Sequence, residues 1–104
     1  MSTALRRITV AELCECEGIS RSLVLKLVQY DIAAPLAGSS VDNWEFDTSS
    51  AGWIRRAVRL QRDLDIDWLA VATLVDLLRE RDALRRENRE LRQRLGRFLS
   101  DEAR

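Results

Sequence analysis

The sequence predicts a mainly α-helical protein: two short helices forming a helix-turn-helix, a short β-hairpin, and a long C-terminal coiled-coil helix. Two observations indicate this fold class. Only one proline and four glycines occur in 104 residues, and apolar residues recur at helical spacing over most of the chain. A chain of this length has room for one core. We therefore expect a globular unit over residues 1–67 and a long helix over residues 68–104.

The first two helices carry clear start and stop signals. Residues 9–12 (TVAE) match the capping box, and Gly18 ends the first helix. Ser20 is the expected N-cap of a second helix that runs from Arg21 to about Tyr30. Two short helices joined across residues 18–20 have the dimensions of a helix-turn-helix.

A break and a third helix follow. Pro35 and the residues 38–40 (GSS) interrupt the helical pattern. Residues 41–46 alternate in polarity, which predicts a short hairpin strand with Trp44 and Phe46 on one side. Residues 47–49 offer N-caps for a third helix that runs to about Leu64, and residues 65–67 form a turn.

The C-terminal helix carries a heptad pattern from residue 74 onward. Apolar residues recur every seven positions, and a single Asn in the core series is a device that fixes register at a cost in stability. Such a helix cannot bury its apolar seam alone, so we predict a homodimer, with parallel and antiparallel pairing both open. The candidate dimer contacts are Leu77, Leu84, Asn88, Leu91, Leu95 and Phe98.

The composition argues against catalysis, cofactors and membranes. The chain has no His, which removes the commonest general base and metal ligand. Cys14 and Cys16 would point about 200° apart on a helix, so they cannot share a metal ion. We therefore expect no enzyme activity, metal or cofactor. The longest apolar run is too short to span a bilayer, and two cysteines without a signal peptide suit the cytoplasm.

The charge is balanced overall but not locally. Residues 1–54 carry four basic and seven acidic residues, with no Lys or Arg between Lys26 and Arg55, whereas residues 55–104 carry thirteen basic and ten acidic residues. Acidic residues are interleaved among the arginines of the C-terminal helix, which reduces the counterion release that DNA binding would give. We interpret that helix as the salt-bridged flank of a coiled coil.

The order of these elements resembles the winged helix-turn-helix of the MerR family of transcriptional regulators. That resemblance implies a second helix and a wing that carry cations to DNA. Here the second helix has only Arg21 and Lys26, the wing has none, and Asp42, Glu45 and Asp47 would repel phosphates. A MerR-like DNA-binding regulator therefore stands as the alternative function, and a plain dimerisation module is a third reading.

A narrower resemblance covers most of residues 8–99. Residues 44–47 (WEFD), 56–60 (RAVRL) and 87–98 (ENRELRQRLGRF), with Leu64 and Asp67-Trp68, resemble the CbpM family of chaperone modulators. The resemblance implies a cytoplasmic protein, reaching the nucleoid only through its partner. It also implies that the chain binds the J-domain of a CbpA-type DnaJ co-chaperone and inhibits its stimulation of DnaK and its DNA binding. No direct contact with nucleic acid is expected.

An acidic surface is the candidate J-domain site. J-domains present a basic helix to DnaK, and complementary charge would speed association while an apolar anchor supplies affinity. The alternative for these acids is a solvated loop that keeps an edge strand soluble. The candidates are Glu15, Glu17, Asp31, Asp42, Glu45 and Asp47, with Trp44 as the anchor.

Overall fold

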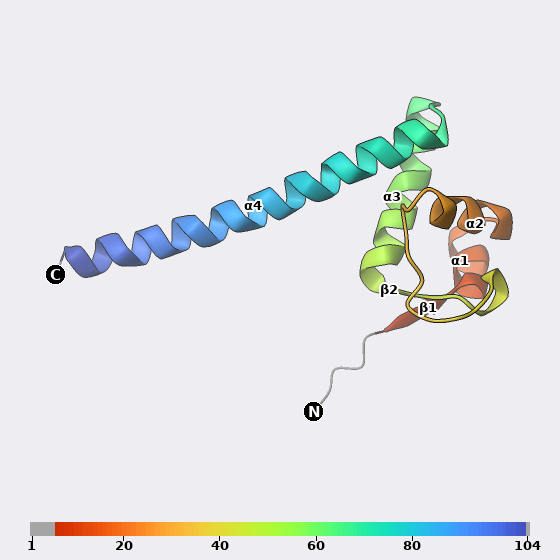
Figure 1. The fold of residues 1–104 in the computed structure, drawn as a ribbon, viewed down its shortest axis with the longest axis horizontal. Helices are drawn as coiled ribbons and strands as arrows, with labels where there is room; N and C mark the ends of the chain where they lie inside the picture. The colour runs from red at the N-terminus through yellow and green to blue at the C-terminus, as the bar shows by residue number, and fades with distance from the viewer. Residues whose placement is uncertain (1–5, 104) are drawn as a thin grey trace.

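The computed structural model describes residues 6–103 as a globular unit from which one long helix projects (Figure 1). The last helix, α4, extends far beyond the other elements, and the chain measures 60 Å along its longest axis. The elements in chain order are β1 (Arg7–Thr9), α1 (Val10–Glu17), α2 (Arg21–Gln29), the 3-10 helix η1 (Val41–Asn43), β2 (Glu45–Asp47), α3 (Thr48–Leu64) and α4 (Trp68–Glu102).

The capping signals of the first two helices are confirmed. The Thr9 hydroxyl accepts a hydrogen bond from the Glu12 backbone N–H at 3.1 Å, and the Glu12 carboxylate accepts one from the Thr9 N–H at 3.2 Å. Gly18 ends α1 with φ at 66°, a left-handed conformation that glycine adopts without a steric cost. The Ser20 hydroxyl caps α2 by accepting from the Leu23 N–H at 3.2 Å.

The predicted fold class is confirmed, but the strands lie differently from the expected pattern. The strand expected over residues 41–46 is confined to β2, because residues 41–43 form η1. β2 pairs antiparallel with β1, with Ile8 opposite Phe46, and a single bridge joins Glu45 to Ala37 on its other side. The turn depends on Gly38, whose φ is 105° and where an added Cβ would collide with the Asn43 carbonyl.

We call residues 36–45 the wing loop. Its two ends are held together by backbone hydrogen bonds, from the Leu36 N–H to the Glu45 carbonyl at 2.8 Å and from the Glu45 N–H to the Ala37 carbonyl at 3.0 Å. Glu45 therefore pairs through its backbone with both Ala37 and Thr9. The loop is anchored to the core at its C-terminal end.

The core draws on every helix. Phe46 is fully buried, and so are Leu27 of α2 and Ile54 of α3. The start of α4 contributes Val71 and Val75 to the same cluster. Burying a side chain of this size stabilises the fold by about 1.5–3 kcal/mol, so the first turns of α4 are held firmly on the globular unit.

Arg79 ties α4 to the end of α2. Its guanidinium donates hydrogen bonds to the backbone carbonyls of Asp31, at 3.4 Å, and of Ile32. It also lies 4.9 Å from the ring centroid of Trp53, whose ring is contacted by Arg56 at 4.3 Å. The direction in which α4 leaves the globular unit is thus set by both α2 and α3.

Beyond that contact α4 is uncovered. Residues 83–103 are all exposed. The exposed residues include the apolar seam, with Leu84 and Phe98 at 57% and 59% of their full accessible surface. No helix within residues 6–103 combines the length and the hydropathy needed to cross a membrane.

Candidate protein-interaction site

The wing loop presents apolar and acidic side chains side by side. Leu36 is 48% exposed at its N-terminal end. At its C-terminal end, the half-buried Trp44 packs edge-on against Phe46, with ring centroids 6.4 Å apart. Asp42 and Glu45 lie on the same loop. The loop contains no Lys or Arg of its own.

Two of the candidate acids on the wing loop are paired with arginines. Asp42 accepts two hydrogen bonds from the guanidinium of Arg21, at 2.7 and 3.1 Å, and these bonds raise the pKa of Arg21 above its ordinary value. Glu45 pairs with Arg7 of β1 at 3.4 Å. All four side chains remain at least one-third exposed, so the charges are neutralised in pairs while the atoms stay accessible to a partner.

Two other candidate acids have structural tasks within the chain. The carboxylate of Asp47 accepts a hydrogen bond from the Ser50 N–H at 2.7 Å and so caps α3. Glu17 pairs with Arg55 of α3 at 2.8 Å, which ties the end of α1 to α3. Both carboxylates stabilise contacts between or within the helices of this chain.

Glu15 and Asp31 are the candidates without such contacts. Both are exposed, and neither forms an ion pair within the part of the chain that the structure describes. Asp31 lies just after α2 with φ at 59°, in the left-handed region that Asp tolerates better than most residues. The seven candidates are therefore spread over α1, the end of α2, the wing loop and β2, and only Asp42, Trp44 and Glu45 share one segment.

Leu36 is the candidate that the sequence interpretation missed. It follows Pro35 in a stretch without periodicity, so neither a helical nor a strand pattern marks it. Only the hydrogen bond from its N–H to the backbone carbonyl of Glu45 places it beside an acidic residue of the wing loop.

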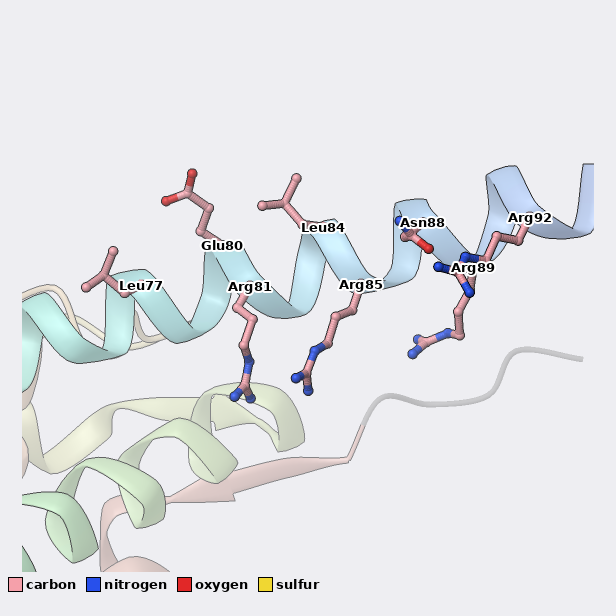
Figure 2. Close-up of a pocket in the computed structure, with 8 residues that line it drawn as sticks. All are labelled: Leu77, Glu80, Arg81, Leu84, Arg85, Asn88, Arg89 and Arg92. Carbon is pink, nitrogen blue, oxygen red and sulfur yellow. The ribbon is translucent and has the colours of Figure 1, made fainter.

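A second surface lies along α4. Figure 2 shows Leu77, Glu80 and Leu84 pointing away from the rest of the chain, while Arg81 and Arg85 point toward the other side of the helix. Together with Asn88, Arg89 and Arg92 they line a shallow groove on α4. Of the predicted dimer contacts, Leu77, Leu84 and Asn88 line this groove. The other three, Leu91, Leu95 and Phe98, are exposed farther along α4, and the dimer itself stays a prediction.

The two cysteines of α1 differ in burial. Cys14 is half-buried against the core, and Cys16 is exposed. Within residues 6–103 no group of three His, Cys, Asp or Glu side chains is arranged to hold a metal ion.

This arrangement of capped helices, wing loop and long helix defines a MerR-type helix-turn-helix regulatory protein. The sequence model of the MerR HTH family regulatory proteins matches residues 8–93. Within that class, the chain is 36% identical to the chaperone modulatory protein CbpM of Pseudomonas entomophila (strain L48), over 93% of this chain and 95% of that protein. It is 37% identical to the chaperone modulatory protein CbpM of Salmonella newport (strain SL254), over 88% of this chain and 90% of that protein. The chain belongs to the CbpM family of chaperone modulatory proteins.

Proposed function

We propose that this protein acts in the cytoplasm as a chaperone modulator that binds the J-domain of a CbpA-type DnaJ co-chaperone. Binding would inhibit both the stimulation of DnaK and the DNA binding of that co-chaperone. The observation that carries the proposal is the wing loop, which joins the exposed Leu36 to Glu45 through a backbone hydrogen bond, also carries Asp42, and has no cation of its own. This surface suits a basic protein helix and not a phosphate backbone.

The internal ion pairs of the wing loop leave its acids available. Exposed pairs of this kind contribute about 0–1 kcal/mol each, so an incoming Lys or Arg competes with Arg21 and Arg7 on nearly equal terms. The net affinity then depends on the apolar anchors, as is usual at protein interfaces. Leu36 and Trp44 are the anchors within reach of these acids.

DNA binding is the second candidate, because the MerR HTH family match favours it. The charges weigh against it. Arg21 would be the natural phosphate ligand at the start of α2, yet the carboxylate of Asp42 lies beside its guanidinium and would repel a phosphate there. The only other cation on α2 is Lys26, and a DNA-binding face needs several cations.

We also propose that the protein is a homodimer held through α4. The exposed apolar side chains of the seam support it, since a helix with such a stripe is stabilised mainly by packing. Sedimentation at tens of micromolar tests this directly. A monomer would contradict it.

An ATPase assay tests the proposed activity. We expect this protein to suppress the stimulation of DnaK ATPase by a CbpA-type co-chaperone, and we expect Leu36→Ala to weaken that suppression. The matched control is Leu69→Ala, which removes the same atoms from a more exposed leucine at the start of α4. Unchanged stimulation with wild-type protein at saturating concentration would contradict the proposal.

A further inference from the structure

A polar cleft lies between the start of α3 and the middle of α4. Its volume is about 520 Å³, which is within the usual range of roughly 300–1,000 Å³ for pockets that hold a ligand. Trp53 and Arg56 of α3 line one wall, and Arg79, Asp82 and Arg86 of α4 line the other. Its described lining residues include neither a wing-loop residue nor a predicted dimer contact. The cleft is therefore a separate surface of the molecule.

The cleft is positively charged. Arg56, Arg79 and Arg86 line it, and Asp82 is the one acidic lining residue in the part of the chain that the structure describes, so three arginines and one aspartate give a net charge of +2. The Asp82 carboxylate is shared with Arg81, which donates to it at 3.2 Å, whereas the hydrogen bond from Arg56 is longer, at 3.5 Å. Arg86 forms no ion pair within residues 6–103.

Trp53 holds two of these arginines in place. The guanidinium carbons of Arg56 and Arg79 lie 4.3 and 4.9 Å from its ring centroid, where the ring attracts a cation. Arg79 is also tied to the backbone carbonyls of Asp31 and Ile32. Because these side chains are ordered before a ligand arrives, less conformational entropy is lost on binding than with free arginines.

The arginines of the cleft still have donors to offer. A guanidinium carries five N–H groups, and Arg56 uses one of them within residues 6–103, for its long hydrogen bond to Asp82. Arginine and carboxylate groups form paired, charge-assisted hydrogen bonds, which are stronger than neutral ones. Arg56 and Arg86 can therefore each receive a carboxylate.

We propose that this cleft binds an acidic segment of a protein partner, whose carboxylate side chains accept hydrogen bonds from Arg56 and Arg86. Toward its free end α4 diverges from α3, so the cleft is open on that side (Figure 1). An extended segment can enter there without a movement of either helix. The protein would thus have two interaction sites of opposite preference, since the wing loop suits a basic partner and the cleft an acidic one.

The charges around the cleft favour the carboxylates of a protein over the phosphates of a nucleic acid. A nucleic acid carries one charge per nucleotide and gains its affinity from many cations along its path. On α4 the arginines beyond the cleft alternate with Glu87 and Glu90, and Asp47 directly precedes α3. A phosphate backbone that continued past the cleft would meet these carboxylates, whereas a short acidic segment would not.

Fluorescence anisotropy of a labelled oligoglutamate peptide, titrated with the full chain at low salt, tests the proposal. We expect saturable binding, which a labelled oligoglutamine peptide should not show. Arg86→Gln should raise the dissociation constant about fivefold, because one exposed charge pair is lost. The matched control is Arg97→Gln, an equal charge change on the same helix outside the cleft, which should leave the dissociation constant within about twofold of wild type.

Two outcomes would overturn the proposal in these titrations. One is the absence of saturable peptide binding, and the other is an equal effect of Arg86→Gln and Arg97→Gln in folded protein. Since Arg86 has no ion pair within residues 6–103, its substitution should leave the fold intact, which circular dichroism checks.

A labelled oligothymidylate of the same charge as the peptide separates the two classes of partner. It should bind more weakly than the peptide. Tighter binding that Arg86→Gln weakens would assign the cleft to a nucleic acid and overturn the proposal. None of these titrations contains a J-domain, so their failure and the failure of the proposed function are distinguishable.

Discussion

The guanidinium of Arg21 donates two hydrogen bonds to the carboxylate of Asp42, at 2.7 and 3.1 Å, and so joins the start of α2 to the wing loop. A carboxylate thus lies directly beside the cation that a helix-turn-helix would offer to DNA at that place. The wing loop beside it supplies no replacement. The fold is that of a DNA-binding regulator, but the start of α2 and the wing loop offer few of the cations that DNA binding needs.

We expect duplex DNA to bind weakly for this reason. Ordinary non-specific binders have dissociation constants of roughly 1–100 μM at physiological salt, and this protein should bind more weakly than that. Fluorescence anisotropy with a labelled duplex of mixed sequence measures it. Saturable binding below about 1 μM would favour the DNA-binding alternative.

Reversing the charge of the wing loop should weaken the J-domain complex. Asp42→Lys combined with Glu45→Lys should raise the dissociation constant about tenfold, because both side chains would then repel a basic helix. The control is Asp101→Lys combined with Glu102→Lys, an equal charge change at the far end of α4. If the folded double variant keeps wild-type affinity, the wing loop is not part of the interface.

Asp47 should matter for stability and not for binding. Asp47→Ala removes the carboxylate that caps α3 and should lower the free energy of unfolding by about 1 kcal/mol. Asp47→Ser, which retains a capping oxygen, should restore most of it. Urea unfolding gives both values. A loss of J-domain affinity in the stable Asp47→Ser variant would mean that Asp47 belongs to the binding surface.

Arg79 should be the arginine of α4 whose removal lowers the free energy of unfolding most. Arg79→Ala deprives the carbonyls of Asp31 and Ile32 of their donor and uncovers Trp53, which should cost about 1–3 kcal/mol. Arg86→Ala, on the exposed part of the same helix, serves as the control and should change stability little. Equal effects of the two substitutions would mean that Arg79 does not hold α4 in place.

The ion pairs of Asp82 should make a small contribution to the free energy of unfolding, and this contribution should be lost in acid. Hydrogen bonds from Arg81 and from Arg56 hold the pKa of Asp82 below its usual value. The stabilisation is therefore present above the unfolded pKa of about 3.9 and is lost as the pH falls below it. Asp82→Asn should be less stable than wild type at neutral pH, and the difference should shrink as the pH falls through the lowered pKa of Asp82, with Glu90→Gln as the control. A difference independent of pH would exclude this cause.

Local signals in the sequence predicted the helices well. The capping box of Thr9 and Glu12 lies within one turn, and the cap at Ser20 is equally local, so neither depends on the rest of the fold. The pairing of Ile8 with Phe46 joins distant parts of the chain. No local pattern predicts such a pairing, and the strand was therefore expected from residues 41–46 alone.

The candidate site was harder to predict. The sequence shows which residues are acidic, but only the folded chain shows which arginines pair with them. The sequence indicated that Asp42, Glu45 and Glu17 are acidic, but Arg21, Arg7 and Arg55 reach them only in the folded chain. The role of Asp47 as a cap was among the options that the sequence offered. No sequence pattern marked Leu36 as a candidate, because its exposure and its neighbours are known only from the structure.

Calorimetric titration with an isolated CbpA-type J-domain, at low and at moderate salt, tests the central claim most directly. The account predicts saturable binding that weakens as the salt rises, because exposed charge pairs are screened beyond about 10 Å at 0.1 M. It also predicts that Leu36→Ala weakens binding at both salt concentrations. No heat of binding from folded protein at either salt concentration would contradict the account.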